Sequence, residues 1–357
     1  MKNLSDILAA LAVERQLDLN RVIGHEANLV LTVMESLLDD VEVKIGARPL
    51  TEYQKARLNQ LLSDVRDLVA DRYETLQGDL FDDLRDLAQQ EARWVLSSTN
   101  GAVGVDLMRA LAPTSTLKAL VDTGLFQGAP LGDWLDRQVA DTAFRFANEI
   151  RLGVATGETN AKIVQRIGGS TRKGLIGVVE TSRRNADALV RTAVQTVSTR
   201  ARNLTWQAND DIVKGKQQVS TLDGRTTDTC IAYAGASWNL ENKPINGTKL
   251  PYNGGVPRHW GCRSTEIPIL KTFRELGLDA DEFTPTTRAS MDGQVSADLT
   301  FADFLAGKST AFQNEVLGKG RAALWREGKI TLQQLLDQRG NPLTLDQLRA
   351  KYDQSRE

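Results

Sequence analysis

Cysteine and histidine are scarce in this chain of 357 residues, which contains two of each. A secreted scaffold built on disulfides needs several cysteine pairs, so two cysteines instead fit a protein kept in a reducing compartment. Hydrophobic residues make up 41% of the sequence and charged residues 25%. That composition is ordinary for a globular protein and excludes a wholly disordered chain.

Long apolar runs are also missing. No window approaches about 18 uncharged apolar residues, so we expect no membrane-spanning segment. The apolar run near the N-terminus ends at Glu14 and Arg15, which makes it too short for a secretory signal. We therefore expect a chain that is made and kept soluble in a cytoplasm.

Neither sign of charge is in large excess, since the formal net charge is -2. The chain is therefore not a polycation that coats nucleic acid. The charges are nevertheless distributed unevenly. Residues 1–100 contain 11 basic and 18 acidic side chains, whereas residues 101–220 contain 16 basic and 11 acidic ones. A partner of the second segment would meet a mildly positive surface.

Apolar residues recur at helical spacing through most of the first 210 residues. Between Thr51 and Leu96 they return every three or four positions, with charges of both signs between them, as in amphipathic helices. Val178–Asp210 contains neither glycine nor proline, which favours a long uninterrupted helix. The C-terminal segment has the same texture, and we expect helices there, including one over Thr331–Gly340.

The texture changes after Lys214. "KQQVSTLDG" alternates like a strand, "STEIPIL" resembles another, and turn-forming residues crowd the stretch between them. We expect an α+β protein, mainly helical, in which a long-helix N-terminal body carries a small β-containing Cys/His module and a helical C-terminal tail. The expected segments are 1–100 and 101–214, both helical, 215–270, a β-rich or α/β module, and 271–357, again helical.

Both cysteines and one histidine fall in two short stretches of this module. Cys230 closes "STLDGRTTDTC", and His259 and Cys262 lie in "PRHWGCR". Two thiols and an imidazole are good zinc ligands. A strong zinc signal has two close pairs of ligands, however, and Tyr233 stands where a Cys-x2-Cys pattern would place a partner for Cys230. We expect no bound cofactor, with zinc at these three residues as the weaker alternative.

Two aspartates that precede Cys230 add further alternatives. Asp223 or Asp228 would be the fourth zinc ligand, and both would serve a nuclease in which His259 acts as the base. Another enzymatic hypothesis pairs Cys230 as a nucleophile with His259 as its base. None of these hypotheses is accompanied by a complete sequence signature.

We favour a structural role for this corner. In a small module with little core, cysteines pack as small apolar residues, and a histidine ring hydrogen-bonds at both nitrogens. The planar fork of Arg263 suits loop carbonyls or a carboxylate, and Trp238 fits a core or interface position. A disulfide between Cys230 and Cys262 stays open for an assembly that leaves the cell, because the sequence does not give its geometry.

Five arginines after Val178 are candidate contacts to a DNA phosphate backbone. They are Arg183, Arg184, Arg191, Arg200 and Arg202. The same residues also suit a solvated helix face, and the sequence leaves both interpretations open.

Taken in order, these motifs resemble the Mu F-like phage head morphogenesis proteins, which are also called minor head or minor capsid proteins. The matching pieces are Arg191-Thr192, "STLDGRTTDTC", "GASW" and "PRHWGCRSTEIP". The resemblance extends over Pro130–Tyr352, while residues 1–100 match nothing. One departure is Tyr233, where many members carry the second cysteine of a Cys-x2-Cys pair.

The resemblance implies a non-enzymatic virion component, a structural minor head protein of a tailed phage. Such proteins lie inside the head near the portal vertex, and in the host cytoplasm during assembly, and assist head assembly or genome packaging and ejection. Their implied partners are the portal protein and the capsid or scaffold protein, with packaged double-stranded DNA as a further contact. The expected structural motif consists of Asp223, Asp228, Cys230, Trp238, Pro257, His259, Cys262 and Arg263.

Overall fold

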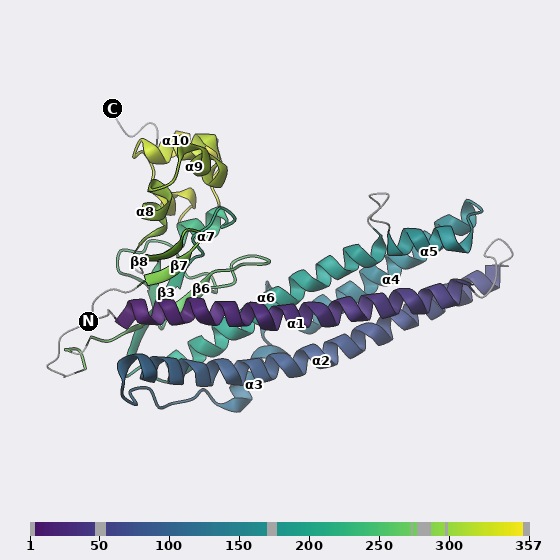
Figure 1. Cartoon of the computed structure of the whole chain (residues 1–357), viewed down its shortest axis with the longest axis horizontal. Coiled ribbons are helices and arrows are strands. Elements are labelled where there is room, and N and C mark those ends of the chain that lie inside the picture. The colour runs from purple at the N-terminus through teal and green to yellow at the C-terminus, as the bar shows by residue number, and fades with distance from the viewer. Residues whose placement is uncertain are drawn as a thin grey trace. The chain divides into compact units, whose positions relative to one another are not determined.

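The structure, a computed structural model, describes residues 4–46, 55–169, 177–272, 274–276, 287–296 and 299–352 (Figure 1). It confirms an α+β protein that is mainly helical. The chain forms two compact units from discontinuous segments. The bundle unit contains Asn20–Ala88 and Thr114–Val197, and the sheet unit contains Met1–Leu19, Gln89–Pro113 and Ser198–Glu357. No helix of the described residues is long and apolar enough to cross a membrane.

These units divide the chain differently from the four consecutive segments expected from the sequence. The three longest described helices each contribute residues to both units. The expected boundary after residue 100 falls inside helix α2 (Lys55–Val103), and the one after residue 214 falls inside strand β3 (Val213–Val219). A change in composition and periodicity along the sequence indicates a change of secondary structure, but it does not indicate which segments pack together.

Amphipathic helices make up the bundle unit. They come from α1 (Leu4–Gly46), α2, α3 (Thr114–Asp122), α4 (Leu131–Ala155), α5 (Asn160–Gly168) and α6 (Val178–Gln207). Helices α1 and α2 run side by side in opposite directions (Figure 1), and Arg72 of α2 donates to Asp40 of α1 at 2.5 Å. Buried residues recur along α1 at steps of three and four, as at Val30, Met34 and Leu37, so this face supplies the core.

A short polar chain crosses the apolar core of the bundle unit. Tyr73 of α2 and Thr142 of α4 share a hydrogen bond of 3.1 Å between their hydroxyl oxygens. Thr142 donates in turn to the hydroxyl of Ser182 on α6 at 3.0 Å. All three groups therefore have partners, as buried hydroxyls require. A small hairpin, β1 (Leu125–Phe126) and β2 (Ala129–Pro130), precedes α4.

An antiparallel sheet forms the centre of the sheet unit. Its strand order is β5-β4-β3-β6, with β4 at Ser237–Asn239, β5 at Pro244–Ile245 and β6 at Thr265–Leu270. The central strand β3 pairs Gly215 with Asn239. A Cβ at Gly215 would lie 2.5 Å from the carbonyl oxygen of Trp238, so only glycine permits this close pairing.

Short helices and a second hairpin complete the sheet unit. They are α7 (Asp228–Ala232), β7 (Thr287–Ser290), β8 (Gly293–Ser296), α8 (Phe301–Ala306), α9 (Thr310–Leu317), α10 (Lys319–Arg326), η3 (Leu332–Leu335) and α11 (Leu345–Tyr352). Ile231, Trp238 and Phe304 belong to a single apolar core that these elements share with the sheet. Strands β1, β2, β7 and β8 lie outside the 215–270 module to which most strands were expected to be confined.

The helix expected over Thr331–Gly340 is wrong, because only the single 3-10 turn η3 forms there. The carboxylate of Asp337 accepts hydrogen bonds from the backbone N–H groups of Arg339 and Asn341, each at 2.8 Å. Gly340 adopts a φ of 86° beside them. An aspartate that bonds its own following backbone favours a turn over helix continuation.

Candidate functional site

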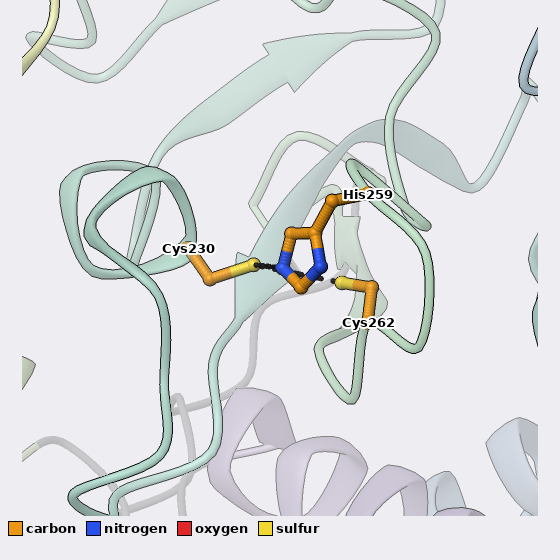
Figure 2. Close-up of side chains that lie close together, drawn as sticks. All are labelled: Cys230, His259 and Cys262. Atoms are coloured by element: carbon orange, nitrogen blue, oxygen red, sulfur yellow. Dashed lines mark hydrogen bonds between the residues drawn. The ribbon is translucent and has the colours of Figure 1, made fainter. Parts of the chain in front are cut away.

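The two cysteines and His259 meet in the sheet unit, between α7 and the loop that leads into β6 (Figure 2). Cys230 lies on α7, which begins after Thr227, and His259 and Cys262 lie on a tight turn closed by the Cys262 N–H donating to the His259 carbonyl at 3.2 Å. The Cys230 Sγ is 3.3 Å from His259 Nε2 and 3.5 Å from Cys262 Sγ. The predicted grouping of these three residues is therefore confirmed in space.

Burial distinguishes the two sulfurs from the imidazole. Cys230 is 2% exposed and Cys262 6% exposed, and both pack against Val256. His259 is half-buried. Both cysteines are free thiols, so the disulfide left open by the sequence is not formed.

Mutual hydrogen bonding gives the two thiols opposite pKa shifts. The hydrogen bond that Cys230 shares with the Cys262 sulfur, together with burial, raises the pKa of the Cys230 thiol. The same bond, with a further one from His259, lowers the pKa of Cys262. The pKa of His259 is raised by its hydrogen bond to Cys262. Cys262 is therefore the more acidic thiol of the pair.

The two aspartates considered as further metal ligands are held by arginines instead. Arg263 donates from both terminal nitrogens to Asp223, at 2.5 and 2.8 Å, and lowers the pKa of that carboxyl group against the opposing effect of burial. Arg321 of α10 donates to Asp228 at the start of α7. The hypothesis of Asp223 or Asp228 as a fourth ligand is therefore wrong, whereas the expected carboxylate contact of Arg263 is confirmed.

Trp238 and Pro257 are the remaining members of the expected motif. The Trp238 ring is fully buried on β4, and its Nε1–H donates to the carbonyl of Leu250 at 2.9 Å. Pro257 follows Val256 through a cis peptide bond at the start of the loop that carries His259. That these two residues belong to the structural motif of the corner stays a prediction.

A buried polar cluster beside the corner was not singled out in the sequence. Glu266 of β6 accepts from the hydroxyl of Tyr252 at 3.1 Å and from the Asn203 amide at 2.9 Å. Arg258 donates to Gln218 of β3 at 2.5 Å, and its guanidinium carbon lies 3.4 Å from the ring centre of Tyr233. The stretch "PRHWGCRSTEIP" contained this signal, because charged residues beside an apolar strand need partners when buried.

Tyr233 therefore has a role that differs from a metal ligand. Its hydroxyl donates to the carbonyl of Pro251 at 2.9 Å, and its ring is stacked against Arg258. At this position the chain has an aromatic residue that packs against a buried cation.

The five candidate DNA-contacting arginines differ in their burial. Arg202 is 1% exposed and donates to the equally buried Glu91 at 2.5 Å, so its assignment as a DNA contact is wrong. Arg200 is half-buried, and this burial lowers its pKa. Of the remaining three, Arg183 and Arg184 both bond Glu180, and Arg191 bonds Asp187.

A cavity of about 1060 Å³ lies near the corner without including it. Ile231, Leu250, Phe301 and Leu332 are among the residues that line it. Cys230, His259 and Cys262 do not line this cavity. This cavity is therefore separate from the sulfur and imidazole groups.

Fold and site together define a mainly helical protein whose small antiparallel sheet anchors a cysteine–histidine corner. Residues 145–267 match the model of the family described as Phage Mu protein F like protein. The match runs from α4 to β6 and contains the whole corner. It supports the predicted resemblance: over this region the chain is similar to the Mu F-like phage head morphogenesis proteins. Comparisons with curated proteins and with solved structures found no match.

Proposed function

We propose that this chain is a structural minor head protein of a tailed phage, which binds the portal or the inner capsid and assists head assembly or genome packaging and ejection. The observation that carries the proposal is the Mu F-like match over residues 145–267. The proposed location is inside the head near the portal vertex, after assembly in the host cytoplasm. The proposed partners are the portal protein and a capsid or scaffold protein.

The corner's geometry supports a structural role. Its two sulfurs are buried, and two arginine–carboxylate pairs, Arg263–Asp223 and Arg321–Asp228, tie the segments around it together. The neighbouring cavity is lined by other residues. We infer that the corner holds α7, β6 and the C-terminal helices in one arrangement rather than acting on a substrate.

Packaged double-stranded DNA is a weaker proposed contact. Because Arg202 is buried and Arg200 half-buried, the preferred candidates are Arg183, Arg184 and Arg191. Each of the three has a carboxylate neighbour on its own helix, which offsets much of its attraction for phosphate. The proposed DNA contact is therefore loose and sensitive to salt.

Co-sedimentation with purified portal rings of the same phage tests the proposal. Association with the rings should persist from low to moderate salt, because helix-face contacts are screened less than phosphate contacts. The Arg183→Ala, Arg184→Ala, Arg191→Ala triple variant serves as the matched control. It should lose retention on double-stranded DNA and keep its portal association. Failure of the wild-type chain to associate with both portal rings and capsid or scaffold protein would contradict the proposal.

An enzyme is the second candidate, because the Cys230 sulfur and the His259 imidazole are in contact at 3.3 Å. A hydrolase would use this pair as nucleophile and base, and a nuclease would use His259 with a metal. Incubation of the purified chain with plasmid DNA and divalent cations tests the nuclease. We expect intact plasmid, and cleavage that disappears in His259→Ala would establish the enzyme instead.

A further inference from the structure

The three donor atoms of the corner converge on one point (Figure 2), and their distances suit a tetrahedral metal site. The Cys230 Sγ lies 3.5 Å from Cys262 Sγ and 3.3 Å from His259 Nε2, and all three donors lie within 4.8 Å of one another. With zinc–sulfur and zinc–nitrogen bonds of about 2.3 and 2.0 Å, tetrahedral geometry separates two sulfurs by about 3.8 Å and sulfur from nitrogen by about 3.5 Å. The observed spacings differ from these by only a few tenths of an ångström.

The imidazole is also oriented as a metal ligand is. Its Nδ1 lies 3.0 Å from the carbonyl oxygen of Trp260. A carbonyl only accepts, so Nδ1 carries a proton and Nε2 is the nitrogen that faces the two sulfurs. Histidine ligands in metal sites almost always donate their second ring N–H to such an acceptor, which fixes the tautomer and the ring orientation.

The corner offers three protein ligands to a metal ion, and the neighbouring carboxylates are bound by other residues. Asp223 and Asp228 are bound by Arg263 and Arg321, and the Tyr233 hydroxyl donates to Pro251. Among the described residues, the only other side chain that hydrogen-bonds His259 Nε2 is Thr227, whose neutral hydroxyl lies 2.9 Å away. Two sulfurs and one nitrogen are a donor set for zinc or a similar borderline ion, and not for magnesium or calcium.

We propose that Cys230, His259 and Cys262 bind one Zn²⁺ ion, with a water molecule as the fourth ligand, and that the ion joins α7 to the loop carrying His259. The inference is independent of the proposed function, because a zinc ion can brace this corner in any protein that folds this way. It reverses the expectation from the sequence, which lacked a second close pair of ligands. The sequence shows how far apart the candidate ligands lie along the chain, whereas the structure gives the distances between their donor atoms.

The first test is the metal content of the full-length chain, produced with zinc in the medium, purified under mild reducing conditions and carrying no polyhistidine tag. We expect one zinc per chain by elemental mass spectrometry. Cys230→Ser, Cys262→Ser and His259→Gln should each lower zinc affinity at least about tenfold. His25→Gln is the matched control, because His25 belongs to the other described cluster of ligand-type side chains, with Glu26 and Asp83. That variant should retain its zinc.

Cobalt substitution keeps the test decisive if a variant fails to fold. The wild-type chain loaded with Co²⁺ should show the strong visible absorption of a tetrahedral ion and a thiolate-to-cobalt charge-transfer band. Zinc should displace both. A wild-type chain with less than a tenth of a zinc per molecule and no thiolate–cobalt band would overturn the proposal. Equal zinc retention by the Cys230→Ser, Cys262→Ser double variant, or loss only in His25→Gln, would overturn it too.

Discussion

Each of the two units buries a glutamate on the α1–α2 pair, and the surroundings of the two glutamates are opposite. Glu91 in the sheet unit is fully buried, and its carboxylate accepts hydrogen bonds from Arg15 at 2.7 Å and from Arg202 at 2.5 Å. Glu26 in the bundle unit is 2% exposed and faces Asp83 and Asp79. The pKa of Glu26 is raised to about 7, first by burial and then by those carboxylates.

The difference shows two ways in which a chain tolerates a buried carboxyl group. The sheet unit neutralises Glu91 with fixed cations, so its stability there depends on retaining specific partners. The bundle unit neutralises Glu26 by proton uptake, so its stability depends on pH. Removal of Glu91 from its arginines should therefore be costly in the sheet unit, and removal of the charge of Glu26 should be beneficial in the bundle unit.

The largest effect is expected from Glu91→Ala. This change leaves the guanidinium of Arg202, which is 1% exposed, without its carboxylate. Loss of one partner of a buried ion pair typically costs about 3–5 kcal/mol of unfolding free energy. Urea unfolding followed by tryptophan fluorescence measures the loss, because Trp94 lies 4.7 Å from the Arg202 guanidinium carbon. A loss below about 1 kcal/mol would show that solvent reaches Arg202 and replaces its partner.

Glu26→Gln should have the opposite sign and a pH dependence. The folded-state pKa of about 7 lies above the ordinary value of 4.5, so the stability tied to the protonated form is complete below pH 4.5 and is lost as the pH rises through 7. Glutamine imitates the protonated form at every pH. We expect a stabilisation of about 3 kcal/mol near pH 8 and little change near pH 4. Equal effects at both pH values would contradict proton uptake by Glu26.

Arg263→Ala tests a pair of intermediate exposure at the corner. Its guanidinium binds Asp223 through two hydrogen bonds, and the two side chains are 36% and 17% exposed. We expect a loss of about 1–3 kcal/mol. A double-mutant cycle with Asp223→Ala separates the pair from other contacts of each residue, and a coupling energy near zero would show that the pair does not brace the corner.

The smallest effect is expected from Asp40→Ala in the bundle unit. Asp40 accepts from Arg72, but the two side chains are 33% and 39% exposed. Pairs exposed to this degree contribute about 0–1 kcal/mol. This variant is the reference for Glu91→Ala, since both remove a carboxylate that binds an arginine across helices. If Asp40→Ala lowered the unfolding free energy as much as Glu91→Ala does, burial would not explain the expected difference between the two pairs.

The sequence predicted helices better than it predicted their partners. Apolar periodicity and the absence of glycine and proline gave α6 nearly to its end, at Gln207. Helix α2 continues through Gly78 without a break, because one exposed glycine costs about 1 kcal/mol and the packed face outweighs it. The contacts of Glu91 with residues 76 positions before it and 111 after it depend on tertiary packing, which periodicity does not contain.

The sequence was enough to predict which residues form the candidate site, but not how they are arranged in space. Scarcity singled out Cys230, His259 and Cys262, and the fork of Arg263 suggested its carboxylate contact. The bond between Arg321 and Asp228 joins residues 93 positions apart, and no local pattern indicates it. Arg202 was misjudged as a surface residue because a buried arginine and an exposed one look alike in an amphipathic helix.

Quantitative mass spectrometry of purified procapsids and mature virions of the encoding phage tests the central claim most directly. If the chain is a minor head protein, it should be present in both kinds of particle, at a copy number near that of the portal subunits and far below that of the major capsid protein. Its absence from procapsids and virions alike would contradict the claim.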